Sequence, residues 1–348
     1  MRLAYYAGHH GRGHVTRAAA VLAHVRADAT LFTSAEPPPL PPGVTHVRLP
    51  PDDPAPGGRG GADDGPFHYA PVGHDGLRRR MARLAAWAAE GPGALAVDVS
   101  VEVAVFGRLL SLPVVVVRQH GARWDEAHGV AYRLAERLLA PFPEALEEPD
   151  APAWVRDKTA YVGGFSRYDG RAAPGPPPDG PPRVVVLGGG GAGGAGSGRA
   201  WSPTDVAAAA RATPGWRWTL LGAAAPPGAP PSLDAVAWAD DVWPHLAAAT
   251  VVVATAGHNA VMEAAAAGRP LVVVPEPRPF DEQVRKAEAL DRVGAALVCP
   301  RWPAPDVWPD TLDRARRLDP APLRALVDRA GAARAAAVLD AVCRERAG

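Results

Sequence analysis

The sequence has few features that point to disulfides, to nucleic acid or to a membrane span. Its only cysteines, Cys299 and Cys343, lack the spacing of metal ligands and form no evident disulfide framework. Lysine plus arginine and aspartate plus glutamate both number 37, so no overall basic field exists to attract nucleic acid. No apolar run approaches the ~20 residues of a membrane span, and the first strand runs into a glycine turn too early for a signal peptide. These absences indicate a cytoplasmic protein with small-molecule partners.

The length of 348 residues suggests about two domains, and a hydrophobic fraction of 47 % is enough for sizeable cores. Short apolar runs alternate with helix-forming segments, which predicts an α/β fold. Residues 166–182 contain six prolines and are expected to link the domains. We therefore expect one domain over residues 1–165 and a second over 183–348. The last helix, expected over 332–346, is expected to pack back on the first domain.

Residues 250–283, TVVVATAGHNAVMEAAAAGRPLVVVPEPRPFDEQ, carry the strongest functional pattern. The β-branched run 251–253 predicts a buried parallel strand, and 259–267 predicts a helix that a glycine and a proline end. A second buried strand follows over 271–274. Gly257 lies in the turn before the helix, where the missing Cβ lets backbone approach a ligand. The free N–H groups of a helix that begins there favour phosphate.

Acidic and amide side chains accompany this phosphate site. Glu263 lies little more than one turn inside the expected helix, and helical side chains lean towards the N-terminus. Its carboxylate cannot help an adjacent pyrophosphate, but it can accept hydrogen bonds from both hydroxyls of a ribose. Asp281, Glu282 and Gln283 add acceptors and an amide for a hydroxyl-rich group. Together they predict a nucleotide-sugar site, whereas the alternative is an alanine-rich surface helix of any doubly wound domain.

The segment AGHNAVMEAAAAGRPLVVVP followed by DEQ resembles the donor-binding signature of GT-B glycosyltransferases. It is most similar to family 28, which includes enzymes that add N-acetylglucosamine to the lipid intermediate of peptidoglycan. The resemblance covers most of residues 183–300, and in the first half it rests mainly on residues 7–21. It implies two Rossmann-like, doubly wound domains that face each other across a cleft. The donor contacts that it implies here are Gly257, His258, Asn259, Glu263, Asp281, Glu282 and Gln283.

A glycine loop follows the first expected strand, residues 2–7. The segment GRGHVTRAAAVLAHV resembles the N-terminal glycine loop of the same enzymes, in which a histidine follows the last glycine. The resemblance places Gly11 and Gly13 on the acceptor side and makes His14 the candidate base, since imidazole accepts a hydroxyl proton near neutral pH. The alternative is a histidine that merely caps the helix.

Polar residues also follow two later strands of the first half, at the carboxyl ends where α/β sheets place ligands. Asp98 is placed to orient His14, although a helix N-cap explains it equally well. His120 is placed to line the acceptor cleft. Residues 124–139 are expected to form one helix.

A glycine-rich loop over 188–196 follows the strand expected at 183–187 and contains GxGxxG, the dinucleotide-binding pattern. That fingerprint requires an acid after the next strand, 216–221, but Gly222 and two alanines stand there, so the oxidoreductase alternative loses its support. A glycosyltransferase uses such a loop to let phosphates or acceptor approach backbone amides. The resemblance adds these donor contacts, the last two beside the nucleobase: Gly188, Gly189, Gly190, Val242 and Trp243.

Three further expectations concern the remaining segments. Residues 50–76 predict a long loop in which His68 and His74 are exposed.

The helix at 77–89 carries three consecutive arginines, and contact with an anionic membrane or a phosphorylated lipid is the alternative to a solvated face. No metal motif is supported by its context, and GT-B enzymes generally work without a metal. We therefore expect no cofactor and no metal, with the leaving diphosphate stabilised by the helix N-terminus at 257–259.

The resemblance and the residues together predict an inverting glycosyltransferase. It would move a sugar from a UDP-linked donor, such as UDP-N-acetylglucosamine, to a hydroxyl of a small-molecule or lipid-linked acceptor, in the cytoplasm or at the inner membrane face. A UDP-sugar 2-epimerase of the same fold is one alternative, and it would need further acid/base carboxylates in the cleft. A non-catalytic nucleotide-sugar-binding protein is another, and it would keep Glu263 without the acceptor-side base.

Overall fold

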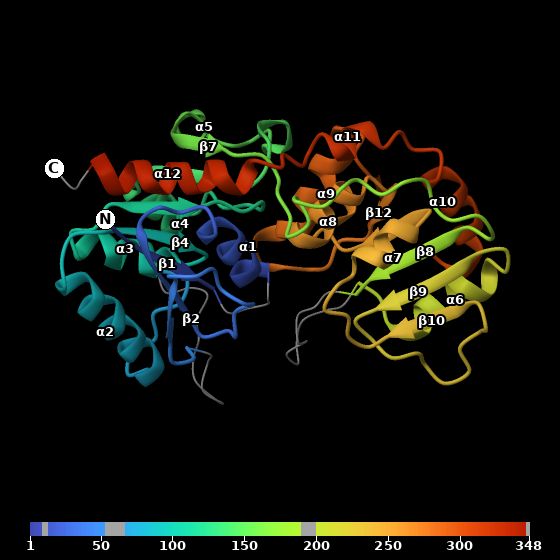
Figure 1. The fold of residues 1–348 in the computed structure, drawn as a ribbon, viewed down its shortest axis with the longest axis horizontal. Coiled ribbons are helices and arrows are strands. Elements are labelled where there is room, and N and C mark those ends of the chain that lie inside the picture. Colours follow the sequence, from blue (N-terminus) through green and yellow to red (C-terminus); the bar gives the residue numbers. More distant parts are fainter. Residues whose placement is uncertain (9–12, 53–66, 189–199, 346–348) are drawn as a thin grey trace.

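Two parallel β-sheets with helices on their faces lie side by side in the computed structural model (Figure 1), which describes residues 1–8, 13–52, 67–188 and 200–345. The first sheet has the strand order β3-β2-β1-β4-β5-β6-β7 and the second β10-β9-β8-β11-β12-β13. In both sheets the order reverses beside the first strand of that sheet, which is the arrangement that creates a ligand crevice in doubly wound folds. The expected α/β class is confirmed.

The strands of the first sheet are β1 (Arg2–Ala7), β2 (Asp28–Thr33), β3 (Thr45–Arg48), β4 (Ala94–Asp98), β5 (Val114–Val117), β6 (Arg137–Ala140) and β7 (Thr159–Tyr161). Those of the second are β8 (Arg183–Leu187), β9 (Arg217–Leu221), β10 (Leu233–Val236), β11 (Val251–Ala254), β12 (Leu271–Val273) and β13 (Leu297–Val298). All the paired strands run parallel. Their valine-rich runs are buried on both faces, as β5 and β11 show, because helices cover both sides.

The helices of the first half are α1 (Gly13–Leu22), α2 (Asp75–Ala89), α3 (Val101–Leu109), α4 (Glu126–Leu134) and α5 (Ala153–Lys158). Those that follow are α6 (Pro203–Ala212), α7 (Trp243–Ala248), α8 (His258–Ala267), α9 (Glu282–Arg292), α10 (Trp308–Ala315), α11 (Ala321–Arg324) and α12 (Gly331–Glu345). Local sequence sets several ends. Ser202 and Asp205 form a capping box at α6, and Gly268 ends α8 with φ 61°, a left-handed conformation that glycine adopts without cost.

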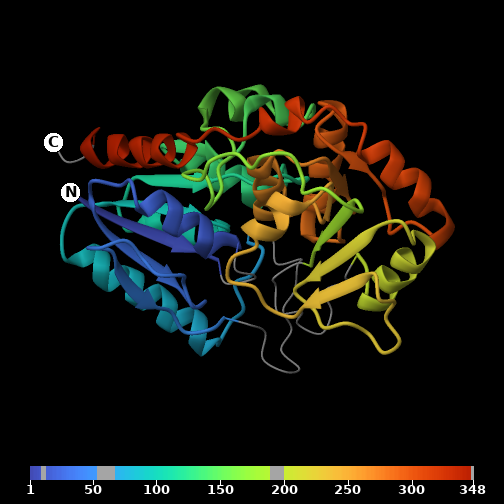
Figure 2. The same cartoon turned by 45° about the vertical axis from the view of Figure 1, so that its right-hand side comes forward.

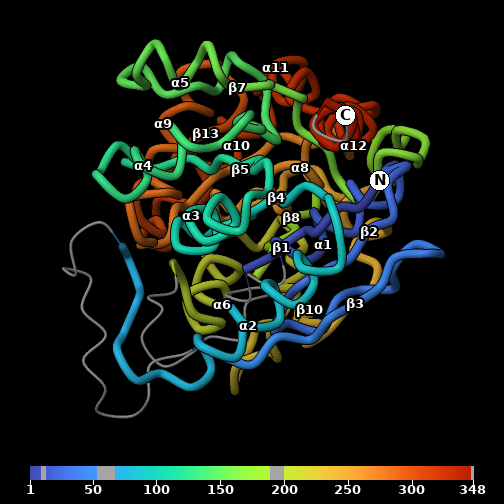
Figure 3. Tube along the Cα trace, turned by 90° about the vertical axis from the view of Figure 1, so that its left-hand side faces the viewer, coloured from blue at the N-terminus to red at the C-terminus, as the bar shows by residue number. Residues whose placement is uncertain are grey.

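The last helix, α12, packs on the first sheet and not on the second. Leu339 and Val342 of α12 belong to the same apolar core as Leu3 and Val21, and Asp340 accepts hydrogen bonds from the backbone of Arg26 and Ala27. The beginning of β1 and the end of α12 therefore lie side by side, as Figures 1 and 3 show. Among the helices described, none is long and apolar enough to cross a bilayer.

One expected element is wrong. The helix predicted over 124–139 ends at Leu134, and residues 137–140 form β6, between β5 and β7. Ala135 already has an extended backbone, with ψ 145°. Leu138 and Leu139 are buried in the sheet, so pairing with two neighbouring strands and burial outweigh the helix propensity of this segment.

Candidate active site

The carboxyl ends of both sheets open into one cleft of about 2230 Å³ between the two halves. In Figure 2 the yellow strands of the second sheet, β9 and β10, point towards the first half. Residues one or two positions after strand ends line the cleft from both sides, namely Gly8, Val99 and Gln119 from the first sheet and Gly188, Gly222 and Thr255 from the second. Neither half contains the whole site.

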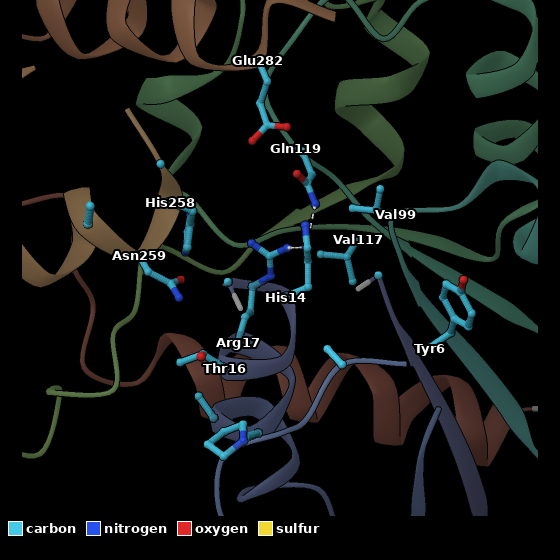
Figure 4. Close-up of a pocket in the computed structure, with 18 of the residues that line it drawn as sticks. Tyr6, His14, Thr16, Arg17, Val99, Val117, Gln119, His258, Asn259 and Glu282 are labelled. Atoms are coloured by element: carbon cyan, nitrogen blue, oxygen red, sulfur yellow. Dashed lines mark hydrogen bonds between the residues drawn. The ribbon is translucent and has the colours of Figure 1, made fainter. Parts of the chain in front are cut away.

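His14 enters the cleft from the first turn of α1, beside Arg17 and Gln119 (Figure 4), and contacts Asp98 at the end of β4. Its Nδ1 lies 3.0 Å from Asp98 Oδ1. Arg17, one turn further along α1, donates from Nε to Oδ2 at 2.9 Å and from Nη2 to Oδ1 at 2.6 Å. The three residues thus form one buried ionic cluster, whose histidine lies at the cleft surface.

Asp98 remains a carboxylate in this cluster. Burial acts to raise its pKa, but the charges of Arg17 and His14 outweigh that effect and hold the pKa well below its usual range. Arg17 Nη2 and Gln119 Nε2 also lie 3.0 and 3.4 Å from His14 Nδ1, but an unprotonated Nδ1 would direct its lone pair at the Asp98 carboxylate oxygen, which is unfavourable. We therefore assign the Nδ1–H tautomer to His14, with Asp98 as acceptor. In this tautomer Nε2 carries a free lone pair and can take a proton.

The alternative that Asp98 caps α3 is wrong. Ser100 is the N-cap, and its hydroxyl accepts the Val103 N–H at 3.1 Å. Between them Val99 has φ 68°, a strained value for a β-branched residue. This turn keeps Asp98 pointed at α1. Gln119 adds a donor that sequence analysis missed, since its Nε2 lies 3.1 Å from Asp98 Oδ1.

The expectation that His120 lines the acceptor cleft is wrong. The ring is buried and stacks on Phe142 with centroids 4.2 Å apart. Burial lowers the pKa of His120, so the imidazole stays neutral below the cleft surface. Gly13 lines the cleft, whereas Gly11, Gly189 and Gly190 lie outside the described residues.

The N-terminus of α8 forms the opposite wall, as the sequence predicts. Gly257, His258 and Asn259 line the cleft there (Figure 4). A Cβ on Gly13 would lie 3.8 Å from Asn259 Nδ2, so the first turn of α1 faces the first turn of α8. Burial, followed by the charge of Lys286, holds the pKa of His258 well below its usual value. His258 therefore adds no positive charge, and the backbone N–H groups provide the electropositive surface.

Glu263 lies in the cleft but not on a helix surface. Its side chain is only 11 % exposed, and Oε1 accepts a hydrogen bond from Arg167 Nε at 2.9 Å. Because α8 also buries Val261 and Met262, the alternative of a surface helix is wrong. Burial raises the pKa of Glu263 above its usual value, and Arg167 opposes only part of that rise. Arg167 thus favours the ionised carboxylate, whose Oε2 is left for a ligand.

The three residues at the start of α9, Asp281 to Gln283, differ in their positions relative to the cleft. Gln283 is buried, and its Oε1 accepts the N–H groups of Ala256 and Glu276 at 3.1 and 2.9 Å, which leaves its amide N–H₂ to face a ligand. Glu282 lines the cleft and pairs with Arg123 at 2.9 Å. Asp281 is exposed, with φ 53°, and lies outside the cleft lining.

The segment expected beside the nucleobase presents Trp238 rather than Trp243. The N–H of Val242 donates to Tyr168 Oη at 3.0 Å and that of Trp243 to Asp241 at 2.9 Å, so both backbone donors are engaged. Trp243 packs against Tyr168. Trp238, by contrast, is 57 % exposed and lines the cleft together with Ala239 and Asp240.

The expected linker is fixed to the second half. Tyr168 is buried in its core, Arg167 binds Glu263, and Arg171 pairs with Asp241 at 2.9 Å. Sequence analysis missed Arg167 because it lies 96 residues before its partner. Gly188 allows a close approach at the end of β8, since a Cβ there would lie 2.4 Å from the carbonyl of Leu221.

The two loop histidines, which we expected to be exposed, are half-buried and hydrogen-bonded. His68 Nε2 lies 2.9 Å from Asp125 Oδ1, and His74 caps α2 by accepting the Leu77 N–H at 3.1 Å. The basic helix is also less cationic than its sequence indicates. Arg80 is fully buried, donates to Tyr6 Oη and pairs with Asp52, each at 2.7 Å.

Comparison with known proteins agrees with this geometry. Residues 226–312 match the glycosyltransferase family 28 C-terminal domain. A curated relative from Sorangium cellulosum (strain So ce56) is 40 % identical over 111 residues, which cover 31 % of this chain and 26 % of the relative. That protein is a UDP-N-acetylglucosamine--N-acetylmuramyl-(pentapeptide) pyrophosphoryl-undecaprenol N-acetylglucosamine transferase. The match therefore spans about a quarter of the relative's length.

Solved structures match the whole chain. The glycotransferase of kitacinnamycin aligns with a TM-score of 0.67 and 17 % identity, over 98 % of this chain and 99 % of that one. Arabidopsis thaliana UGT89C1 complexed with UDP aligns with a TM-score of 0.67 and 15 % identity, and the alignment covers 98 % of this chain and 99 % of UGT89C1. At such identities the likeness shows the fold alone. The findings together confirm a GT-B fold with a family 28-like second half.

Proposed function

We propose that this family 28-like protein of GT-B fold is an inverting glycosyltransferase that moves a sugar from a UDP-linked donor to a hydroxyl acceptor. One observation carries the proposal. His14, which Asp98 holds from behind, lines one wall of the cleft, and the N-terminus of α8, with Glu263 one turn on, lines the opposite wall. A base and a nucleotide diphosphate site that face each other are the two parts that glycosyl transfer needs.

The wall built by the second half suits a nucleotide sugar. The N–H groups at the start of α8 would hold the diphosphate, and Glu263 Oε2 would accept the ribose hydroxyls. The exposed indole of Trp238 provides a stacking surface for the base. The amide N–H₂ of Gln283 would donate to the sugar. We infer UDP because the curated relative is named for a UDP-linked sugar and because UGT89C1, which shares the fold, was solved in complex with UDP.

The wall built by the first half suits a hydroxyl acceptor. His14 Nε2 would take the acceptor proton while the acceptor oxygen attacks the anomeric carbon from the face opposite the diphosphate. The bond between that carbon and the diphosphate oxygen then breaks, and the configuration inverts. Asp98 would hold the imidazole in place and stabilise its positive charge, as the start of α8 would stabilise the leaving diphosphate.

The acceptor wall is largely apolar. Leu77, Met81, Val101 and Val103 contribute to it with Tyr6. Such a surface suits the apolar body of a small molecule or of a lipid-linked intermediate, the two acceptor classes that we propose. Two of the carboxylates that line the cleft, Glu282 and Glu276, are each paired with an arginine, at 2.9 and 2.7 Å, and this pairing weakens their support for a 2-epimerase.

Calorimetric titration of the protein with UDP, ADP, GDP and dTDP tests the donor assignment. We expect UDP to bind most tightly and 2′-deoxy-UDP more weakly, since the latter lacks one hydroxyl for Glu263. Equal affinities for all the diphosphates would contradict a uracil-selective site. No measurable binding of any of them would refute the nucleotide-sugar function itself.

A further inference from the structure

His68, Asp125 and His128 meet at the rim of the cleft, in a cluster that the transfer mechanism does not use. Each offers one ligand atom, and the three atoms lie within 4.8 Å of one another. We propose that these residues bind a divalent transition-metal ion such as Zn²⁺. The inference rests on this cluster and not on the proposed function, and no step of sugar transfer runs through the metal.

The backbone holds the three ligands in place. Asp125 is the N-cap of α4 and accepts the His128 N–H at 3.1 Å, so two ligands come from one helical turn. The third comes from a separate segment, in which the N–H groups of His68 and Tyr69 donate to Glu102 Oε1 at 2.7 and 2.9 Å. These bonds anchor the backbone at His68 to α3, which packs against α4, so the segment that carries the His68 imidazole lies beside α4 before any ion arrives.

The donor atoms already converge on one another. His68 Nε2 lies 2.9 Å from Asp125 Oδ1, and His128 Nδ1 lies 2.5 Å from Asp125 Oδ2. Two imidazole nitrogens and a carboxylate oxygen are a donor set that borderline cations prefer, and three protein ligands with an open fourth position are typical of reactive zinc sites. A small outward shift of the three side chains would admit an ion in place of the protons that they now share.

The residues around the cluster leave the fourth coordination position of the ion accessible from one side only. Phe280, from the second half, packs against both rings, with centroids 5.0 Å from His68 and 4.9 Å from His128. His128 is only 7 % exposed, whereas Asp125 is 37 % exposed. The apolar ring therefore covers one side of the cluster, and water or an acceptor heteroatom can reach the ion from the other.

Arg123 opposes metal binding through its contact with His128. Its Nη1 lies 3.2 Å from His128 Nε2. A metal on Nδ1 moves the imidazole proton to Nε2, where it opposes this N–H donor. Arg123 also donates to Glu282 and to the carbonyl of His120, at 2.9 and 3.0 Å. It can therefore give up the His128 contact and keep two partners.

Titration of chelator-treated, full-length protein with Co²⁺ and Zn²⁺ tests the proposal. We expect one equivalent of Co²⁺ to bind with the visible absorption of a low-coordinate site, and Zn²⁺ to displace it. His68→Ala should weaken binding about tenfold or more, since one of three protein ligands is lost. His24→Ala, which removes an exposed histidine at the end of α1, is the matched control and should leave the affinity unchanged.

Because His128 is buried, Asp125→Asn is the second probe. Asparagine keeps the helix cap but removes the carboxylate ligand, so this variant should fold and lose the Co²⁺ absorption. Failure of the wild-type protein to take up a stoichiometric ion would overturn the proposal. The same conclusion follows if His68→Ala and Asp125→Asn bind Co²⁺ as tightly as His24→Ala does.

Discussion

His14 Nδ1 lies 3.0 Å from Oδ1 of Asp98, a fully buried carboxylate that Arg17 holds through two hydrogen bonds. The two residues are 84 positions apart in sequence and come from α1 and β4. The geometry makes His14 the first target for substitution. His14→Ala should lower turnover by roughly 10²–10⁴-fold, the contribution of a general base, and leave UDP affinity near that of the wild type.

Steady-state assays of UDP release measure turnover, and calorimetry measures UDP affinity, so the two effects of a substitution can be separated. His24→Ala serves as the control, since this exposed histidine lines the same cleft but lies beyond the end of α1 that is remote from His14. Asp98→Asn should also lower turnover, because an amide can hold the wrong imidazole tautomer. A His14→Ala protein with full turnover would leave His14 a structural residue of the loop.

Glu263→Ala should weaken UDP binding by roughly 1.5–3 kcal/mol, the range for a hydrogen bond to a charged group. The same substitution should hardly change the affinity for a 2′,3′-dideoxy analogue, which has no ribose hydroxyls to lose. Calorimetry of both ligands measures the difference. Glu288→Ala, on the exposed face of α9, is the control, and equal losses for UDP and the dideoxy analogue would remove Glu263 from the ribose site.

Trp238→Ala should weaken UDP binding by roughly 1–3 kcal/mol, the range for stacking between a base and an aromatic side chain. Trp154 is a suitable control, since it is also partly exposed but lies on α5 in the first half. Fluorescence or calorimetric titration gives the affinities. If Trp154→Ala and Trp238→Ala bind UDP equally well, the indole of Trp238 is not the platform for the base.

Lys286→Met should stabilise the protein at low and neutral pH. Burial, opposed by Glu282 and reinforced by Arg17, lowers the pKa of Lys286 from 10.5 to about 7, and its Nζ has no hydrogen-bond partner among the described residues. Below pH 7 both the folded and the unfolded chain carry the charge, so the full cost of its burial is present. Between pH 7 and 10.5 the unfolded chain binds more protons, so the stability of the wild type rises with pH.

The gain from Lys286→Met is therefore expected to be largest below pH 7, at roughly 1–3 kcal/mol or more for an unpaired buried group, and to shrink as pH rises. Denaturant unfolding at pH 6 and pH 9 measures it. Lys158→Met is the comparison: burial also lowers the pKa of Lys158, but this half-buried lysine donates to the carbonyl of Arg133, so its pH-dependent gain should be smaller. A gain that does not depend on pH would argue against a cation buried in the folded state.

The sequence predicted those parts of the fold and site that local pattern determines. The run 251–253, the glycine turn and the helix formers after it specify β11 and α8 almost to the residue, since burial and helix punctuation act over short distances. The spacing from Gly257 to Glu263 follows from the same helix. The strands expected over 2–7, 183–187 and 216–221 were predicted to within one residue for the same reason.

The sequence could not show which distant residues meet. Arg167 reaches Glu263 only because Tyr168 is packed into the second core, and His68 reaches Asp125 only when α4 and the preceding segment pack together. Arg17 is different. It lies one helical turn after His14, on the same face, and that spacing is a signal that the sequence offered.

The central claim is tested most directly by ³¹P and ¹H NMR of wild-type protein and His14→Ala incubated with a panel of UDP-sugars, with and without hydroxyl acceptors. The account predicts that the wild type releases UDP from at least one donor, faster with acceptor than with water, and forms a product of inverted anomeric configuration. His14→Ala should release UDP much more slowly. A UDP-sugar that is isomerised, or one that is bound but never cleaved, would contradict the account.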